Sequence, residues 1–231
     1  MSDQTTTTSR FSFFTSIITA TLGVISLGIA VGTPPLSGPF CPADCFQYPY
    51  TEAVSRWPRD YYWMFPAMLF VLAYLVWVAT IHQFAEPGKK LYSRIGMLFA
   101  AGSGLILFSD YFIQVTIIQP ALLNGETAGI ALWTQFNSHG LFIALEEIGY
   151  LLMSVSFLFL GLTFTGAGRG EKALRWIFLA GFILTIVALI VISVMFGIHR
   201  EYRFEVAVIT IDWVVVIVTS LIFSRTIKVR S

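Results

Sequence analysis

Long apolar runs without a charged residue constrain this chain more than any other feature. No Asp, Glu, Lys or Arg occurs over residues 11–43, 61–85 or 176–199. A helix that crosses the hydrocarbon core of a bilayer needs about 20 consecutive apolar residues. The runs therefore predict three transmembrane helices, at about residues 11–31, 62–84 and 176–198.

Three further apolar stretches contain acidic residues. They lie at about residues 95–118, 139–164 and 204–223, and they hold Asp110, Glu146 with Glu147, and Asp212 respectively. The sequence thus predicts an all-α, polytopic integral membrane protein with six helices in one bundle over residues 11–224. Residues 1–10 and 225–231 are expected to form cytoplasmic tails.

The composition excludes a soluble globular protein. Hydrophobic residues make up 56% of the chain and charged residues only 12%, against about 25% charged residues in a typical soluble domain. The formal net charge is +1, and no basic stripe offers phosphate contacts. We therefore expect the lipid bilayer as partner and no binding of nucleic acid.

The first apolar run could also be read as a cleaved signal peptide. The apolar part of such a peptide is typically about 7–15 residues long and is followed by small residues at the cleavage site. Here the run covers residues 11–31 and ends in GTPPL. A retained first membrane span is the preferred interpretation.

The distribution of cations orients the predicted helices. Ten of the 14 Lys and Arg residues fall on one side of the bundle, at its two tails and in its two short loops. The opposite loops hold only four: Arg56, Arg59, Arg200 and Arg203. Because cytoplasmic loops carry the excess of Lys and Arg, both termini are predicted to be cytoplasmic and the protein to lie in the cell or plasma membrane.

Cys41 and Cys45 are the only cysteines, and both fall in the first loop predicted to lie outside. A disulfide suits that oxidising side. Two free thiols, or half of a metal site that needs further ligands, are the alternatives.

The acidic residues of three helices fall at one predicted depth. Counted at about 1.5 Å per residue, Asp110, Glu146, Glu147 and Asp212 all lie roughly 10–15 Å below the outer boundary. Facing lipid, each ionised group would cost about 2.5–3.5 kcal/mol. We therefore expect the four carboxyl groups to converge in one outward-opening cavity between the mutually adjacent spans 95–118, 139–164 and 204–223, with the other three spans forming the wall toward lipid.

Helical spacing extends this predicted cavity. Gln114 shares a helix face with Asp110, while His139 and Tyr150 share one with Glu146. Like charges in a dry pocket cannot all stay ionised, so several carboxyl groups are expected to be neutral at pH 7 unless a cation is bound. The mouth of the cavity is predicted to hold His199, Arg203 and Glu205. No metal site is predicted, because the HExxH pattern that would indicate one is absent.

Three classes of function fit these features, and neither a catalytic nor a cofactor motif decides among them. The first is a protein that binds or transports a cation, a proton or a cationic amphiphile, with aromatic neighbours such as Tyr111 and Trp213 assisting by cation–π contact. The second is an intramembrane acid–base enzyme, of isomerase or hydrolase type, acting on a lipid-soluble substrate. The third is an accessory subunit whose buried acids only pair helices. A homo-oligomer is compatible with all three.

Overall fold

The computed structural model describes residues 2–230, with side chains placed over residues 7–227. Within these residues every regular element is a helix. In chain order the α-helices are α1 (Ser2–Gly32), α2 (Met64–Phe84), α3 (Lys90–Ile113), α4 (Gln119–Leu123), α5 (Ile130–Trp133), α6 (Leu141–Thr163), α7 (Arg169–Phe196) and α8 (Glu201–Arg230). Short 3-10 segments connect them at η1 (Gly38–Phe40), η2 (Thr51–Arg56), η3 (Arg59–Tyr61), η4 (Pro87–Lys89) and η6 (Gly197–His199), and η5 (Gln114–Ile118) is a π-helical turn.

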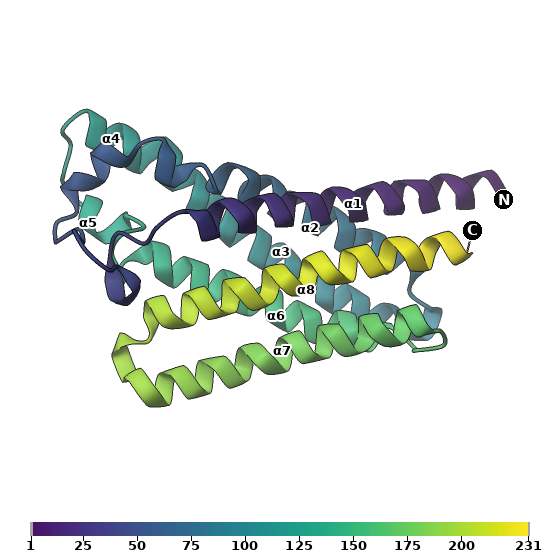
Figure 1. Ribbon diagram of the computed structural model, residues 1–231. Coiled ribbons are helices and arrows are strands. Elements are labelled where there is room, and N and C mark those ends of the chain that lie inside the picture. The colour runs from purple at the N-terminus through teal and green to yellow at the C-terminus, as the bar shows by residue number, and fades with distance from the viewer. Residues whose placement is uncertain (1, 231) are drawn as a thin grey trace.

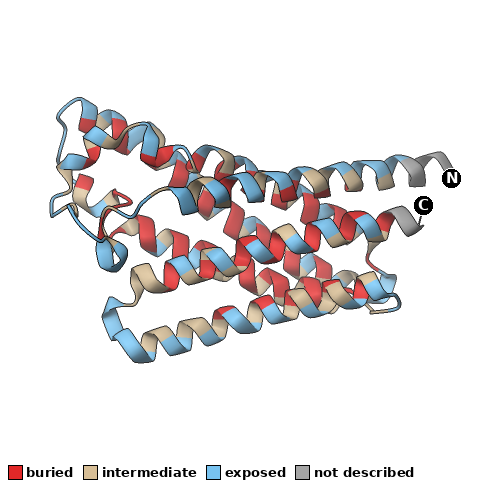
Figure 2. Ribbon diagram, in the orientation of Figure 1, coloured by how far each residue is buried: buried red, intermediate tan, exposed pale blue. Residues whose placement is uncertain are grey.

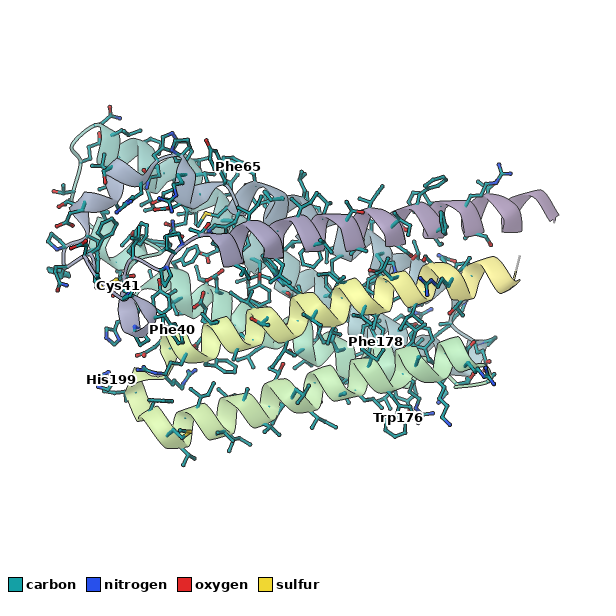
Figure 3. The ribbon with its side chains drawn as sticks, viewed as in Figure 1. Phe40, Cys41, Phe65, Trp176, Phe178 and His199 are labelled. Atoms are coloured by element: carbon teal, nitrogen blue, oxygen red, sulfur yellow. A yellow bond between two sulfur atoms is a disulfide. The ribbon has the colours of Figure 1, made fainter. Side chains whose placement is uncertain are left out.

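Six helices of the described chain are long and apolar enough to cross a membrane: α1, α2, α3, α6, α7 and α8. They run lengthwise in one bundle (Figure 1). Both termini lie at one end, which we call the terminal end. The loops that contain Cys41 and His199 lie at the other, which we call the disulfide end (Figure 3). The predicted all-α, six-helix membrane fold is confirmed.

Several helices are longer than the sequence suggested. Helix α1 begins at Ser2, so most of the expected tail 1–10 is helical, and α8 continues to Arg230 through most of the expected tail 225–231. The reason is local, because the chain contains no Gly or Pro before Gly23 and none after Gly197, so no helix breaker interrupts these ends. The third span likewise continues beyond 118, through η5 into α4, where Pro120 sits in the first turn and needs no intrahelical donor.

Helices α2 and α6 form the centre of the bundle. Over half of the apolar window of each (56%) is buried, against 17% for α7, and Figure 2 shows α7 mostly exposed or half-buried. The expectation that span 62–84 belongs to the lipid-facing wall is therefore wrong. Its Tyr74 hydroxyl hydrogen-bonds to Ser156 of α6, and its Trp77 ring packs on Phe178 of α7 and Phe223 of α8.

Helix α7 illustrates how the bundle separates core from lipid. Phe178 is fully buried, whereas Trp176, two residues earlier, is 59% exposed. The two rings point to opposite sides of the helix (Figure 3). An apolar ring costs little in contact with acyl chains, so the outer face of α7 needs no protein partner.

Candidate functional site

A cavity of about 250 Å³ opens at the disulfide end of the bundle. We call it the α1/α8 pocket, because the last turns of α1 and the first turns of α8 supply much of its wall. The start of α6 and the segments before α2 and α6 close the rest. Its lining residues are Leu27, Ala30, Val31, Thr33, Pro34, Pro35, Leu36, Asp60, Trp63, Gln135, Phe136, Phe142, Ile143, Tyr202, Glu205, Val206, Ile209, Thr210 and Trp213.

The wall of the α1/α8 pocket is aromatic and acidic. Five aromatic side chains line it: Trp63, Phe136, Phe142, Tyr202 and Trp213. Asp60 and Glu205 are the only ionisable carboxyl groups on this wall, and no Lys or Arg is among the described residues that line it. The pocket therefore combines negative charge with π faces.

Glu205 lines this pocket, and the buried Glu146 lies behind it, outside the lining. The two carboxyl groups lie close enough to interact, and Glu146 is completely buried. Two buried carboxyl groups this close retain at least one proton, because both cannot stay ionised side by side. With one proton, the pair carries a single negative charge at the inner wall of the pocket.

A series of three donors ends on Glu146. Trp213 Nε1 donates to Tyr150 Oη (2.8 Å), Tyr150 Oη lies 2.7 Å from Tyr111 Oη, and Tyr111 Oη donates to Glu146 Oε1 (2.8 Å). Because the Tyr111 proton goes to Glu146, Tyr150 must donate to Tyr111. All three groups are fully buried, so the bonds polarise one another in the same direction. The series favours negative charge on Glu146.

Asp60 is held differently. Its carboxylate lies 3.5 Å from Arg59 Nε and 4.0 Å from Arg56 Nε, and it is only 2% exposed. Neither of its oxygens has a hydrogen-bond partner among the described residues. The two guanidinium groups offset its charge, whereas no described cationic side chain lies beside the Glu146–Glu205 pair.

The other predicted carboxyl groups do not line this pocket, and each has its own immediate partners or surroundings. Ser154 Oγ donates to Asp212 Oδ1 (2.7 Å) and lies 2.9 Å from Thr185 Oγ1 of α7. Arg200 donates to Glu147 Oε2 (2.8 Å). Asp110 is buried, and neither of its oxygens has a partner among the described side chains. None of these three residues lines the α1/α8 pocket.

The helix arrangement explains this difference. Helix α6 packs against α3 on one side and against α7 and α8 on another. Because successive residues of α6 point about 100° apart, Glu146 and Glu147 reach different neighbours. Equal depth along the bundle therefore did not bring all the carboxyl groups to one place.

The predicted mouth residues also divide. Glu205 lines the pocket, whereas His199 and Arg203 do not, and neither does His139, which was expected on the Glu146 face. His139 Nδ1 lies 2.9 Å from Glu201 Oε1, on the exposed surface of the disulfide end. The Arg203 guanidinium stacks over the Phe196 ring and donates to the His199 carbonyl.

The Gln114 side chain positions one wall of the pocket and makes no hydrogen bond to the Asp110 carboxyl group. Its Nε2 donates to the Trp133 carbonyl (2.5 Å), and its Oε1 accepts from the Gln135 backbone N–H (3.2 Å). It thereby holds the segment that carries Gln135 and Phe136 into the pocket.

Sequence reasoning missed several pocket residues. In the sequence, Trp63 is typical of an interfacial aromatic and Asp60 of an acid near a helix start. Phe136 and Tyr202 precede the predicted spans 139–164 and 204–223, in segments with no pattern of their own. The available signal was the pair Asp60 and Glu205, since each stands beside an apolar span at the predicted outer end.

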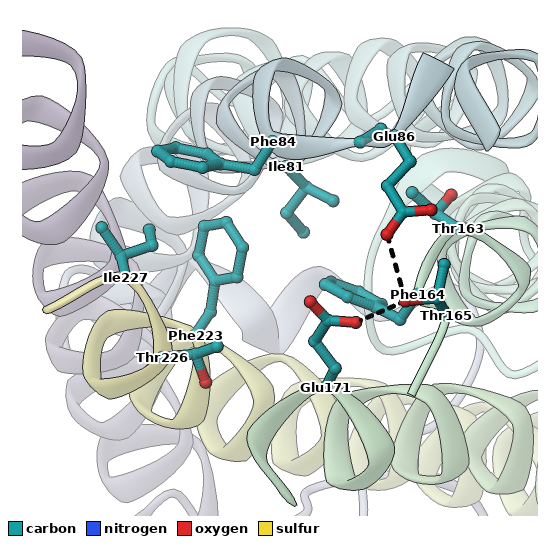
Figure 4. Close-up of a pocket in the computed structure, with 11 residues that line it drawn as sticks. Ile81, Phe84, Glu86, Thr163, Phe164, Thr165, Glu171, Phe223, Thr226 and Ile227 are labelled. Atoms are coloured by element: carbon teal, nitrogen blue, oxygen red, sulfur yellow. Dashed lines mark hydrogen bonds between the residues drawn. The ribbon is translucent and has the colours of Figure 1, made fainter. Parts of the chain in front are cut away.

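A second cavity lies at the terminal end (Figure 4). There Thr165 Oγ1 lies 2.8 Å from Glu171 Oε2 and 3.4 Å from Glu86 Oε1. The cavity measures about 20 Å³, which is room for a single water. It is too small for an organic ligand.

Within the part of the chain that the structure describes, no three His, Cys, Asp or Glu side chains are grouped to hold a metal ion. Cys41 and Cys45 are joined as a disulfide. The chain matches no protein-family model, no curated protein and no solved structure. Its fold class and its place in the membrane therefore follow from the six apolar helices alone.

Proposed function

We propose that this multi-pass membrane protein binds an organic cation in the α1/α8 pocket, as a receptor or as a carrier. One observation carries the proposal: the buried Glu146–Glu205 pair has no cationic side chain beside it and borders a cavity walled by aromatic rings. An uncompensated carboxylate inside a membrane protein is costly. A bound cation would supply the missing partner.

The aromatic wall matches the same ligand chemistry. A cation over the face of Trp, Tyr or Phe gains about 0.5–2 kcal/mol, and quaternary ammonium groups are typical guests of such cages. Trp213 contributes in a second way, because its indole N–H starts the donor series toward Glu146. The residues that would contact the ligand and those that hold the countercharge are thus connected.

The orientation of the protein belongs to this proposal. With both termini in the cytoplasm, as the positive-inside rule predicts, the disulfide end and its pocket face the outside. A disulfide-bonded loop beside the pocket agrees with that side.

Binding of benzyltrimethylammonium to the protein in lipid nanodiscs tests the proposal. Its charge is permanent, so the result does not depend on protonation of the ligand. We expect calorimetry to detect binding that Glu205→Gln weakens at least tenfold, since a hydrogen bond or contact to a charged group contributes about 1.5–3 kcal/mol. The uncharged isostere neopentylbenzene should bind far more weakly.

Glu126→Gln is the matched control. Glu126 is an exposed acid at the same end of the bundle and does not line the pocket. It should leave the affinity unchanged. Equal affinities of Glu205→Gln and wild type, with both folded as judged by their melting temperatures, would refute the assignment of Glu205.

A further inference from the structure

The α1/α8 pocket has one wall that faces lipid. On α1, Leu27, Ala30 and Val31 line it at a spacing of three and four residues, which places them on one helix face. On α8, Val206 and Thr210 line it one turn apart. Val31 is 79% exposed and Val206 is 43% exposed, so these side chains border the pocket and the acyl chains at once.

The two helices separate toward this end of the bundle. Deeper in the membrane they are in close contact, since a Cβ added at Gly23 would lie 2.7 Å from Ile217. Figure 1 shows the α1 and α8 ribbons diverging from there toward the disulfide end, where the pocket lies between them. The space between them is a wedge that widens at the pocket.

The side toward water is crossed by hydrogen-bonded chain. Tyr202 Oη donates to the Gln135 carbonyl (3.1 Å) and lies 3.3 Å from Ser37 Oγ. The Phe46 N–H donates to the Leu36 carbonyl (2.8 Å). These bonds tie the segment after α1 to α8 and to the segment before α6, across the end of the pocket. The wedge between α1 and α8 has no such bonds across its opening among the described residues.

We infer that the pocket opens sideways into the bilayer between α1 and α8, and that its ligand is a single-chain cationic amphiphile whose head lies at Glu205 and whose hydrocarbon chain leaves through this opening. The inference rests on the proposed function and adds the class of ligand and its route. Glu205 lies four residues into α8, about 6 Å along the helix at 1.5 Å per residue. Glu205 therefore lies near the disulfide end of the bundle.

The energetics favour a ligand whose head group binds the protein and whose hydrocarbon chain stays in lipid. A methylene group gains about 0.8 kcal/mol on leaving water, but it gains the same in lipid as in an apolar pocket. A chain that stays in the bilayer therefore brings the ligand to the membrane without help from the protein. Selectivity then resides in the head group, where the protein supplies its charge and its aromatic rings.

Blocking the opening tests the inference in nanodiscs. Ala30→Phe fills the wedge with a ring, and Val24→Phe is the matched control, because Val24 is exposed on the same helix and does not line the pocket. The probes are benzyltrimethylammonium and hexadecyltrimethylammonium, the second at a low ratio to lipid. We expect Ala30→Phe to weaken binding of the long-chain probe at least ten times more than it weakens binding of the short probe, while Val24→Phe changes neither.

Each other outcome has a defined meaning. If the wild type binds neither probe, the proposed function fails and this inference fails with it. If it binds the short probe and not the long one, the proposed function stands and the lateral opening is wrong. If Ala30→Phe leaves both affinities unchanged or weakens both equally, the lateral opening is also wrong.

A second measurement covers the case in which Ala30→Phe does not fold. A hexadecyltrimethylammonium probe with a nitroxide at the chain end is bound to the wild type, and its spin relaxation is measured. Oxygen dissolved in lipid should relax the nitroxide, whereas a water-soluble nickel chelate should not. Relaxation by the chelate, or protection from both reagents, would overturn the inference.

Discussion

At Glu146, three donors in series end on one carboxylate oxygen. Trp213 lies on α8, Tyr150 on α6 and Tyr111 on α3, and all three side chains are fully buried. Replacing Tyr111 or Tyr150 by an apolar residue would leave a buried polar atom without its partner. The stability of the bundle and the charge of the pocket therefore depend on the same few atoms.

Tyr111→Phe tests this dependence. The substitution removes the bond to Glu146 and the acceptor of Tyr150, so we expect the free energy of unfolding to fall by about 1–3 kcal/mol, the cost of an unsatisfied buried polar group. Thermal or denaturant unfolding in one detergent, followed by circular dichroism, gives the difference. Tyr62→Phe, at a half-exposed ring, should change stability by less than about 0.5 kcal/mol. Equal losses for the two variants would show that the donor series contributes nothing to stability.

At the scale of the element, the start of α6 sets the position of Glu146 in the bundle. Gly140 is the N-cap residue of this helix. A Cβ there would lie 2.9 Å from the carbonyl oxygens of both Asn137 and Leu132. Backbone atoms on two sides give way less easily than a side chain would, so this position requires glycine for space.

Gly140→Ala should accordingly destabilise the protein, by about 1–3 kcal/mol as for other overpacked sites. It should also weaken binding of benzyltrimethylammonium, because the displaced segment carries Gln135 and Phe136. Gly102→Ala is the control, since its added Cβ meets only Leu152, at 3.6 Å. Alanine favours a helix interior by up to about 1 kcal/mol, so this control should be neutral or stabilised. An unchanged melting temperature for Gly140→Ala would contradict the close contact.

Long apolar runs, three of them free of charge, identified the elements themselves. All six spans could be predicted, because the requirement for about 20 apolar residues is local. The helices that pack against each span could not be predicted from the sequence, and α2 shows why. Its run is as apolar as a lipid-facing helix, and only the three-dimensional arrangement reveals that Tyr74 and Trp77 face partners from α6, α7 and α8.

At the scale of the whole molecule, the candidate site could be predicted from the sequence only in part. The depth of each carboxyl group follows from sequence position, whereas its direction around the helix axis relative to other helices does not. Glu205 was placed at the mouth and does line the pocket. Asp110, Glu147 and Asp212 were placed in a common cavity, and their partners or surroundings in the structure lie elsewhere.

The orientation of the bundle is a prediction at this scale. Ten Lys and Arg residues at the terminal end and four at the disulfide end place the terminal end in the cytoplasm. With the native cysteines joined as a disulfide, a new cysteine can be labelled selectively. In intact cells, Gly125→Cys should react with an impermeant maleimide and Gly168→Cys should react only after permeabilisation. The reverse pattern would invert the orientation and place the pocket in the cytoplasmic leaflet.

The location of the pocket between α1 and α8 has a consequence for synthesis. About 175 residues separate Ala30 from Glu205, so at about 5–20 residues per second α1 waits on the order of ten to thirty-five seconds for α8. Three hydroxyl groups of α1 need no partner from α8 during this time, because Ser16, Thr19 and Ser26 each donate to a carbonyl oxygen of α1 itself. These three hydroxyl groups are thus satisfied before α8 exists, and the proposed site for an amphiphile is incomplete until α8 enters the membrane.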